Sequence, residues 1–389
     1  MKAIVLSGGG GKGAYQIGVW KALRKLKYDY KIVTGTSIGA INGLMMIQKE
    51  FYKSYNLWRN VNPKKMIGID FKGNQYFDYI KKIFKEGGIP TSNVEKFVNK
   101  LYNKRKFFKS DIDYGIVTYN FSKLKPHVMQ KKELLEKDIV KYIVASATCF
   151  PAFKMTNINN EKYIDGGFYD YFPINLAIDM GATEIIAIDL DAIGIRRKIK
   201  NKEIKITYIK PNNEISGFLE FDKKKTRKDI KYGYNDTMKK FGIFYGKKYT
   251  FYGNELDEGK YQRILEFTDQ IFDSSIRIVS FKISKLFKDI NDKEKLQCVF
   301  DEKLEYLLEK FDYEDSKVYD AKKISKKIYK KIKYNQIKNK KSKMSIEDNN
   351  RIAFLYKLIE EKRYKEIREN INSGCNEFIC AMYLYFIKR

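Results

Sequence analysis

The N-terminal part of the chain alternates between short apolar runs and glycine-rich turns. Residues 3–6 form an apolar run of the length of a buried strand, and glycines follow it. Residues 15–26 then repeat apolar side chains at helical spacing, up to Leu26. A second apolar run, Ile32 and Val33, leads into Gly35. The pattern predicts a strand, a glycine turn, a helix and a second strand.

Strands and helices continue to alternate as far as residue 250. We expect helices over about residues 134–147 and 229–241, the latter from Ile230, Tyr234 and Met238 at helical spacing. We expect further strands over residues 114–118, 127–130, 154–158, 162–164, 184–190 and 204–209. Such alternation is typical of an α/β fold, with a mainly parallel sheet covered by helices on both faces.

Between these elements lies a helical insertion over residues 51–102. Turn signals divide it at Asn62-Pro63, Gly73-Asn74 and residues 87–90. We expect it to cap a cleft.

The pattern of residues 251–389 predicts a second domain, which we expect to be all-helical. The first domain is then expected over residues 1–250. An apolar stripe over residues 264–276 and capping signals for helices over residues 345–362 and 377–387 support this division. Residues 322–343 are rich in lysine, with Ile324, Ile328 and Ile332 on one face. This segment is either a helix lying on anionic lipid or a solvated helix packed on a neighbour. The helical pairs also suit docking of a protein partner.

The charge of the chain is strongly positive, +29 from 77 Lys and Arg against 48 Asp and Glu. The excess is spread along the sequence, so it does not mark a nucleic-acid site, and we expect no nucleic-acid partner. A diffuse positive surface favours transient association with anionic membranes. The 43% of hydrophobic residues argues against disorder.

Targeting and metal signals are weak. The start of the chain has a strand pattern in place of an apolar signal segment, and no apolar run has transmembrane length. The four cysteines, Cys149, Cys298, Cys375 and Cys380, lack metal or redox spacing. We therefore expect a cytoplasmic protein, peripheral at the membrane at most, without a metal or cofactor.

The strongest chemical signal is Ser37, which lies between Gly35 and Gly39 directly after an apolar run. A G-x-S-x-G sequence between a strand and a helix is typical of a nucleophile elbow, in which a sharp turn exposes the serine hydroxyl at a helix N-terminus. The alternative is an ordinary turn serine flanked by glycines.

The glycines Gly8–Gly11 and Gly13 predict a backbone cradle for a negative oxygen. A P-loop is excluded because Lys12 is followed by glycine in place of Ser or Thr. A dinucleotide fingerprint requires an acidic residue after the next strand, and the one nearby acid, Asp29, precedes that strand. The oxygen of a tetrahedral intermediate is then the better ligand.

The third signal is Asp165, which ends an apolar pair and is followed by Gly166 and Gly167. It is either an ordinary Asp-Gly turn or a base for Ser37. The chain has one histidine, His127, so a Ser-His-Asp triad would need that residue. We favour Asp165 acting directly on the serine.

Together these stretches resemble the patatin-like phospholipases, and the resemblance covers about the first two-thirds of the chain. It rests on GGGGKGAYQIGVWKAL, GTSIGAING, ASATCFPAF, DGGFYDYFPI and EISGFLEF, in that order. The resemblance implies a three-layer α/β/α fold, with Ser37 as nucleophile, Asp165 as base and the amides of Gly9 and Gly10 as oxyanion hole, helped by Ile38.

Two positions of the resemblance leave questions. Lys12 stands where the family carries a basic residue, which either meets a lipid phosphate or pairs with a structural carboxylate. Tyr171 stands where the family often has Asn. The expected function is hydrolysis of membrane-lipid esters. The alternative is an inactive scaffold that binds anionic membrane or nucleic acid through its basic helical tail.

Overall fold

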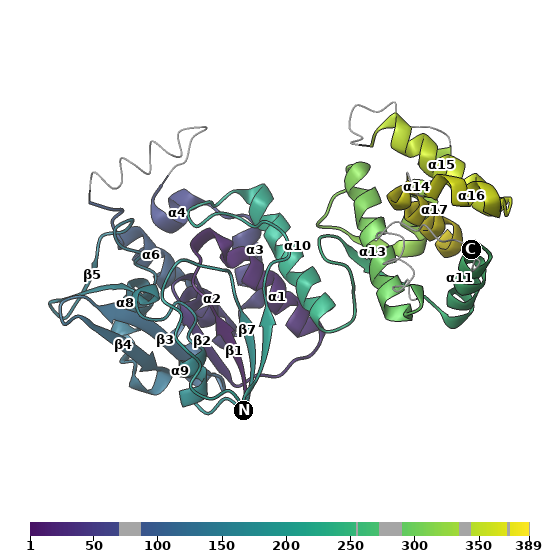
Figure 1. The fold of residues 1–389 in the computed structure, drawn as a ribbon. Helices are drawn as coiled ribbons and strands as arrows, with labels where there is room; N and C mark the ends of the chain where they lie inside the picture. The colour runs from purple at the N-terminus through teal and green to yellow at the C-terminus, as the bar shows by residue number, and fades with distance from the viewer. Residues whose placement is uncertain (70–86, 254–255, 272–289, 334–343, 372–373, 389) are drawn as a thin grey trace. The chain divides into compact units, whose positions relative to one another are not determined.

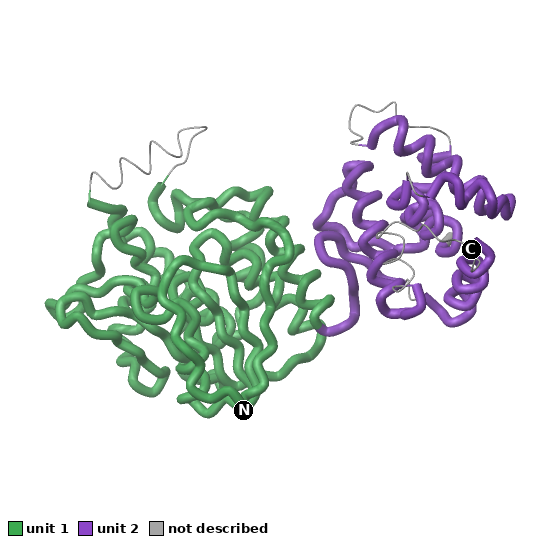
Figure 2. Tube along the Cα trace, in the orientation of Figure 1, with its two compact units in different colours: residues 1–240 green, residues 241–389 purple. Residues whose placement is uncertain are grey.

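The computed structural model describes residues 1–69, 87–253, 256–271, 290–333, 344–371 and 374–388. Its contacts divide the chain into two compact units, residues 1–240 and residues 241–389 (Figure 2). Thr250, where we expected the boundary, begins a short strand of the second unit.

The first unit is built on a mixed sheet of eight strands in the order β5-β6-β3-β2-β1-β7-β8, with β4 also paired to β3. The strands are β1 (Lys2–Leu6), β2 (Ile32–Thr36), β3 (Asp113–Asn120), β4 (Lys125–Gln130), β5 (Thr156–Ile158), β6 (Glu161–Asp165), β7 (Glu184–Ile188) and β8 (Lys205–Ile209). The five strands β3-β2-β1-β7-β8, in this spatial order, run parallel to one another. β4 and β6 pair antiparallel with β3, and β5 pairs antiparallel with β6. The predicted α/β class with a mainly parallel sheet is confirmed.

Helices cover both faces of this sheet (Figure 1). Because successive side chains of a strand point to opposite faces, β1 directs Ile4 and Leu6 to one apolar cluster and Ala3 and Val5 to another. The second cluster contains the short helix α9 (Ile174–Asp179). The first contains α1 (Gly13–Lys25), α2 (Ile38–Ile47), α3 (Phe51–Arg59) and α10 (Lys223–Lys240).

The strand register determines where the functional loops meet. Leu6 pairs with Gly35, and Thr36 pairs with Val117, so the turns after β1 and β2 leave the same edge of the sheet. β6 runs antiparallel to β3 and ends with Asp165 opposite Thr118. Ligands of open α/β sheets bind at this carboxyl edge.

The helical insertion contributes α4 (Pro63–Ile67), α6 (Ser92–Leu101) and α7 (Lys104–Lys109). At its first predicted break, the Asn62 side chain accepts a hydrogen bond from the Lys65 amide and caps α4. The predicted break at Gly73-Asn74 lies outside the described residues.

One predicted helix begins later than expected. In place of a helix from residue 134, two 3-10 turns precede α8 (Ile139–Ser146). The Glu133 carboxylate accepts a hydrogen bond from the Gln130 amide and closes the first turn, after which Leu134 and Leu135 have extended backbone. The apolar periodicity alone did not show this interruption.

The second unit has its own apolar core, assembled around α17 (Cys375–Lys388). The other helices that the structure describes in this unit are α11 (Glu258–Ile271), α13 (Lys293–Lys310), α14 (Ala321–Lys333), α15 (Ile346–Glu360) and α16 (Tyr364–Ile371). The expectation that this region is all-helical was wrong in one respect. β9 (Thr250–Tyr252) and β10 (Val318–Asp320) form a parallel pair. Strands of three residues are too short to be recognised from the sequence pattern.

The lysine-rich segment packs on neighbouring helices. Ile324, Ile328 and Ile332 are buried in the core of the second unit, so the apolar face of α14 does not meet lipid. Residues 272–276 of the expected apolar stripe and 334–343 of this segment lie outside the described residues. Among the helices that the structure describes, none is both long and apolar enough to cross a membrane.

Candidate active site

Ser37 occupies a strained turn between β2 and α2. Its backbone has φ 58° and ψ −126°, which is unfavourable for a residue with a Cβ atom. The turn is so tight that a Cβ atom on Gly35 would lie 2.3 Å from the Gly39 carbonyl oxygen. The predicted elbow geometry is therefore present, with the serine at the N-terminus of α2.

A second serine holds this turn in place. The Ser37 amide donates a hydrogen bond to Ser146 Oγ at 3.0 Å, and Ser146 Oγ donates to the Val117 carbonyl at 2.6 Å. Ser146 is fully buried at the end of α8. It thereby ties the elbow to the central strand β3. We had assigned it no role, although it lies in the ASATCFPAF stretch.

The carboxylate of Asp165 lies against the Ser37 hydroxyl. The Asp165 backbone amide donates to the Thr148 carbonyl at 2.8 Å, and the Gly167 amide donates to Asp165 Oδ1 at 2.7 Å. Burial raises the pKa of Asp165 to about 6, while hydrogen bonds from Ser37 and Gly167 oppose this shift. Asp165 is thus a stronger base than an exposed aspartate.

His127 lies on β4 in a different environment. Its ring stacks on Tyr142, with 5.2 Å between centroids, and meets Tyr163 edge-on at 5.6 Å. Burial, followed by the charge of Lys125, lowers the pKa of His127. The side chain that the structure brings to the Ser37 hydroxyl is Asp165 and not this histidine.

The glycine turn after β1 lies beside Ser37. The Gly8 amide donates to the Tyr171 carbonyl at 2.9 Å, and the Gly11 amide donates to the Phe218 carbonyl at 2.7 Å. Within the described part of the chain, no backbone hydrogen bond outside the regular helices and strands is donated by Gly9 or Gly10. Gly10 has φ 57°, a left-handed conformation that suits glycine. An oxyanion donor would need an N–H group without such a partner.

Lys12 has a role different from both alternatives considered above. Its Nζ donates hydrogen bonds to the carbonyl oxygens of Leu190 and Asp191, each at 3.0 Å. The side chain thus joins the glycine turn to the loop after β7. Gly13 follows it and begins α1, and Gly166 and Gly167 lie in the short turn after Asp165.

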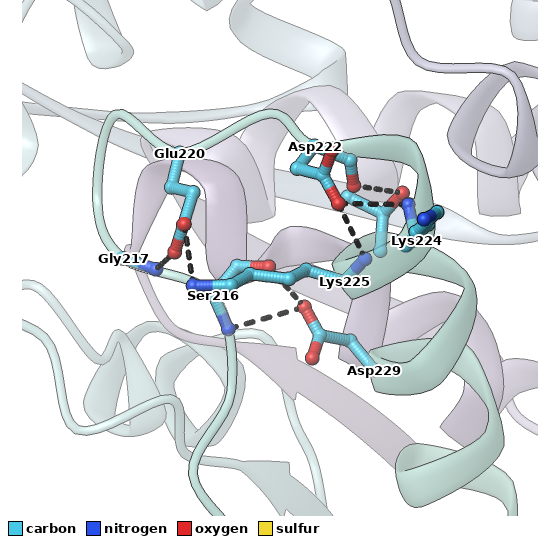
Figure 3. Close-up of polar contacts among 8 residues, drawn as sticks. Ser216, Gly217, Glu220, Asp222, Lys224, Lys225 and Asp229 are labelled. Atoms are coloured by element: carbon cyan, nitrogen blue, oxygen red, sulfur yellow. Dashed lines mark hydrogen bonds and ion pairs between the residues drawn. The ribbon is translucent and has the colours of Figure 1, made fainter. Parts of the chain in front are cut away.

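Residues 214–221 pack against Gly10 and Gly11 of the glycine turn, and Figure 3 shows the polar contacts within and beside this loop. Ser216 donates to Asp229 Oδ2 through its hydroxyl at 2.6 Å and its amide at 3.2 Å, and the Gly217 amide donates to Glu220 Oε2 at 2.9 Å. Burial raises the pKa of Asp229 to about 6. Through Phe218, this loop accepts the Gly11 hydrogen bond.

A buried polar network joins α1, α2 and α3 beneath the site. Asn42 Nδ2 donates to Gln16 Oε1 at 2.8 Å, and Trp58 Nε1 donates to Asn42 Oδ1 at 3.0 Å. Gln16 Nε2 donates in turn to the Ser7 carbonyl at 2.9 Å. Because each polar group is satisfied, the network fixes the glycine turn relative to the elbow helix.

Tyr171 contributes to the site through its backbone. Its carbonyl accepts the Gly8 amide, and its own amide donates to the Ile195 carbonyl at 2.9 Å. The Tyr171 ring stacks on Phe172 with an interplanar angle of 16°. The loop after Asp165 is therefore held by main-chain bonds and ring packing at the position where the resemblance suggests an amide side chain.

An apolar cavity includes Ser37 and Gly10 in its lining. Its walls are almost entirely hydrophobic, and α4 and α6 of the helical insertion contribute Met66, Ile67, Val94 and Phe97. Phe153, Phe218, Leu219 and Phe221 complete much of the lining. The lining therefore presents an apolar surface next to the serine. Within the described ranges, no group of three or more His, Cys, Asp or Glu side chains is placed to hold a metal ion.

A strained serine beside a buried carboxylate, at the carboxyl edge of an α/β sheet, is an arrangement found in serine hydrolases. Residues 4–178 match the family model of patatin-like phospholipases. The match assigns this region, a little under half of the chain, to the patatin-like phospholipase family, a family of lipid hydrolases.

Comparisons with known proteins agree with this family. The chain is 24% identical over 198 residues to patatin-like phospholipase domain-containing protein 7 of Rattus norvegicus, an alignment that covers 48% of this chain and 13% of the rat protein. It is 25% identical over 187 residues to a probable lipid hydrolase of Invertebrate iridescent virus 6, covering 46% and 63% of the two chains. The chain therefore spans less than two-thirds of these curated relatives.

Among solved structures, VipD from Legionella pneumophila is similar with a TM-score of 0.39 and 14% identity. That alignment covers 100% of this chain and 91% of the VipD chain.

Proposed function

We propose that the N-terminal unit hydrolyses carboxylic esters of membrane lipids, in the manner of a phospholipase A or lysophospholipase, through a dyad of Ser37 and Asp165. The observation that carries this proposal is the position of the buried Asp165 carboxylate beside the hydroxyl of Ser37, in the strained turn at the N-terminus of α2. A general base needs a proton affinity above that of an exposed carboxylate, and burial supplies it at Asp165.

In the first step, Asp165 accepts the hydroxyl proton while Ser37 Oγ attacks the ester carbonyl carbon. The amides of Gly9 and Gly10 donate hydrogen bonds to the oxyanion, which is worth roughly 3 kcal/mol of barrier for each donor. The alcohol then leaves with the proton from Asp165. Water, deprotonated by the same carboxylate, releases the fatty acid and restores Ser37.

The cavity supports a lipid substrate. Its hydrophobic lining beside Ser37 suits an acyl chain, and exclusion of water there strengthens the hydrogen bonds to the oxyanion. The relatives named above are phospholipase or lipid hydrolase proteins, which favours the same class of substrate.

Covalent labelling tests the nucleophile directly. We expect a fluorophosphonate probe to form one adduct on Ser37, detected by mass spectrometry of the digested chain, because that hydroxyl is activated. Ser37→Ala removes the adduct, whereas Ser122→Ala, at an exposed serine between β3 and β4, retains it. A folded chain without an adduct would contradict the proposal and favour the scaffold alternative.

The pH dependence of hydrolysis tests the base. The proposed mechanism requires Asp165 as a carboxylate, and its pKa is raised to about 6. We therefore expect kcat/KM for an uncharged soluble ester to be constant above this pH and to fall about tenfold for each pH unit below it. A profile that stays flat down to pH 4 is incompatible with Asp165 as the base.

A further inference from the structure

A surface loop after β7 combines an exposed apolar tip with a run of cations. Ile193 is 102% exposed and Ile195 is 52% exposed, although large aliphatic side chains are usually buried. Arg196, Arg197 and Lys198 follow directly and are exposed as well. Apolar and positive side chains are thus exposed on one short segment, residues 191–200.

Hydrogen bonds to the candidate active site hold this loop on both sides of Ile193. Lys12 Nζ binds the Leu190 and Asp191 carbonyls, and the Ile195 amide donates to the Gly167 carbonyl at 2.9 Å. The Ile195 carbonyl accepts the Tyr171 amide at the same distance. Ile193 is thus presented by an ordered loop, which lowers the entropic cost of placing it in a binding surface.

The loop is also close to the proposed base. A Cβ atom on Gly167 would lie 3.1 Å from Asp165 Oδ1 and 3.8 Å from the Ile193 carbonyl oxygen. A lipid surface that binds Ile193 would therefore lie close to Asp165, the proposed base. Phe168, which follows Gly167 in sequence, is itself 44% exposed.

The cations divide into structural and available groups. Arg196 forms an ion pair with Asp189 at 2.9 Å and lies over the Phe172 ring, so it stabilises the loop. Arg197 lies over the Tyr169 ring at 4.6 Å and near the buried Asp170 carboxylate, and its side chain is exposed, as is that of Lys198. Positive groups held next to an apolar tip are complementary to lipid phosphates next to acyl chains.

We propose that residues 191–200 dock the first unit on an anionic lipid surface, with Ile193 entering the acyl region and Arg197 and Lys198 contacting lipid phosphates. The proposal rests on the lipid hydrolase function proposed above and specifies how that site reaches its substrate. A protein partner is less well matched, because a stable protein interface needs about 800 Å² on each side and this patch has few apolar side chains.

Vesicle binding tests the docking loop without requiring turnover. The full chain with Ser37→Ala is sedimented with phosphatidylcholine vesicles containing phosphatidylglycerol, at physiological ionic strength. We expect Ile193→Asp to lower the partition coefficient by about tenfold or more, because an aliphatic side chain no longer enters hydrocarbon. Leu135→Asp changes an apolar residue that is 63% exposed elsewhere in the same unit, and should alter binding less than twofold.

A second pair of substitutions tests the cations. The double variant Arg197→Gln, Lys198→Gln should lose about fivefold in partition coefficient for each charge removed on anionic vesicles. On vesicles of phosphatidylcholine alone, the double variant should bind as its parent does. Matched melting curves show that the variants are folded.

The outcomes separate this proposal from the hydrolase function. Parental binding by Ile193→Asp, an equal loss with Leu135→Asp, or failure of the parent to bind anionic vesicles would overturn the docking proposal. A chain that docks as expected but forms no fluorophosphonate adduct would overturn only the proposed activity.

Discussion

Asp165→Asn is expected to lower kcat for a soluble ester by about 10³- to 10⁴-fold. The amide has nearly the same shape as the carboxylate but does not accept the Ser37 proton, so general-base catalysis is lost. The proposed oxyanion binding by the glycine turn should remain, so we expect the residual rate to stay above that of the reaction in water. Initial rates with a nitrophenyl ester measure this effect.

The same substitution should stabilise the fold at pH 8. The pKa of Asp165 is raised to about 6, so the native state binds its proton more tightly than the unfolded chain does. The associated stability is fully present below the ordinary aspartate pKa and is lost as pH rises through about 6. At pH 8 the buried charge costs up to about 3 kcal/mol, which an asparagine avoids. We expect a melting temperature several degrees above the parent at pH 8, with the difference shrinking towards pH 4.

Asp170→Asn is the matched control. Burial also raises the pKa of Asp170 to about 6, but its Oδ1 accepts a hydrogen bond from the Phe172 amide and not from Ser37. This variant should show a similar pH-dependent gain in melting temperature with a far smaller loss of kcat. Equal losses of activity in the two variants would contradict a specific role of Asp165 as base.

Gly10→Ala is expected to lower kcat by about a hundredfold or more. A Cβ atom at this position would lie 2.1 Å from the Phe218 carbonyl oxygen, so the glycine turn must move away from residues 214–221. That movement displaces an amide that we propose as an oxyanion donor, and loss of one donor costs roughly 10²- to 10³-fold. The fluorophosphonate labelling rate should fall in parallel, because negative charge also develops on the phosphoryl oxygen of the probe when the serine attacks it.

Gly242→Ala controls for backbone strain in this experiment. Gly242 has φ 71°, but nothing in the described chain lies within 4 Å of the place that its Cβ atom would occupy. A similar conformational cost of about 1 kcal/mol then arises without displacement of the glycine turn. If both variants lost activity equally, general destabilisation and not the oxyanion geometry would explain the effect.

The order of strands and helices in the first unit could be predicted because each is short, apolar and bounded by turn residues. Residues 3–6 and 184–190, for example, read as buried strands and are found as β1 and β7. The start of α8 could not be read from apolar spacing, because a hydrogen bond from the Gln130 amide to Glu133 decides it. The pairing of β9 with β10 depends on contacts between segments far apart in sequence.

The proximity of Ser37 and Asp165 was predicted from motifs, and the structure brings the two side chains together. The supporting residues were not predicted. Ser146 and Asp229 have ordinary sequence neighbourhoods, and each acts on a main-chain group that reaches it only in the folded chain. Lys12 was expected at a phosphate or a carboxylate, whereas two carbonyl oxygens hold it.

The bonding of Lys12 bears on discrimination between lipid headgroups. An ammonium has three N–H donors, and two carbonyl oxygens already bind the one on Lys12, so at most one donor is left for a phosphodiester next to the glycine turn. We therefore expect other groups to contribute most of the selection between zwitterionic phospholipids and uncharged glycerides. We expect replacement of Lys12 to weaken the contact between the glycine turn and the loop after β7 more than it changes the preference for a lipid headgroup.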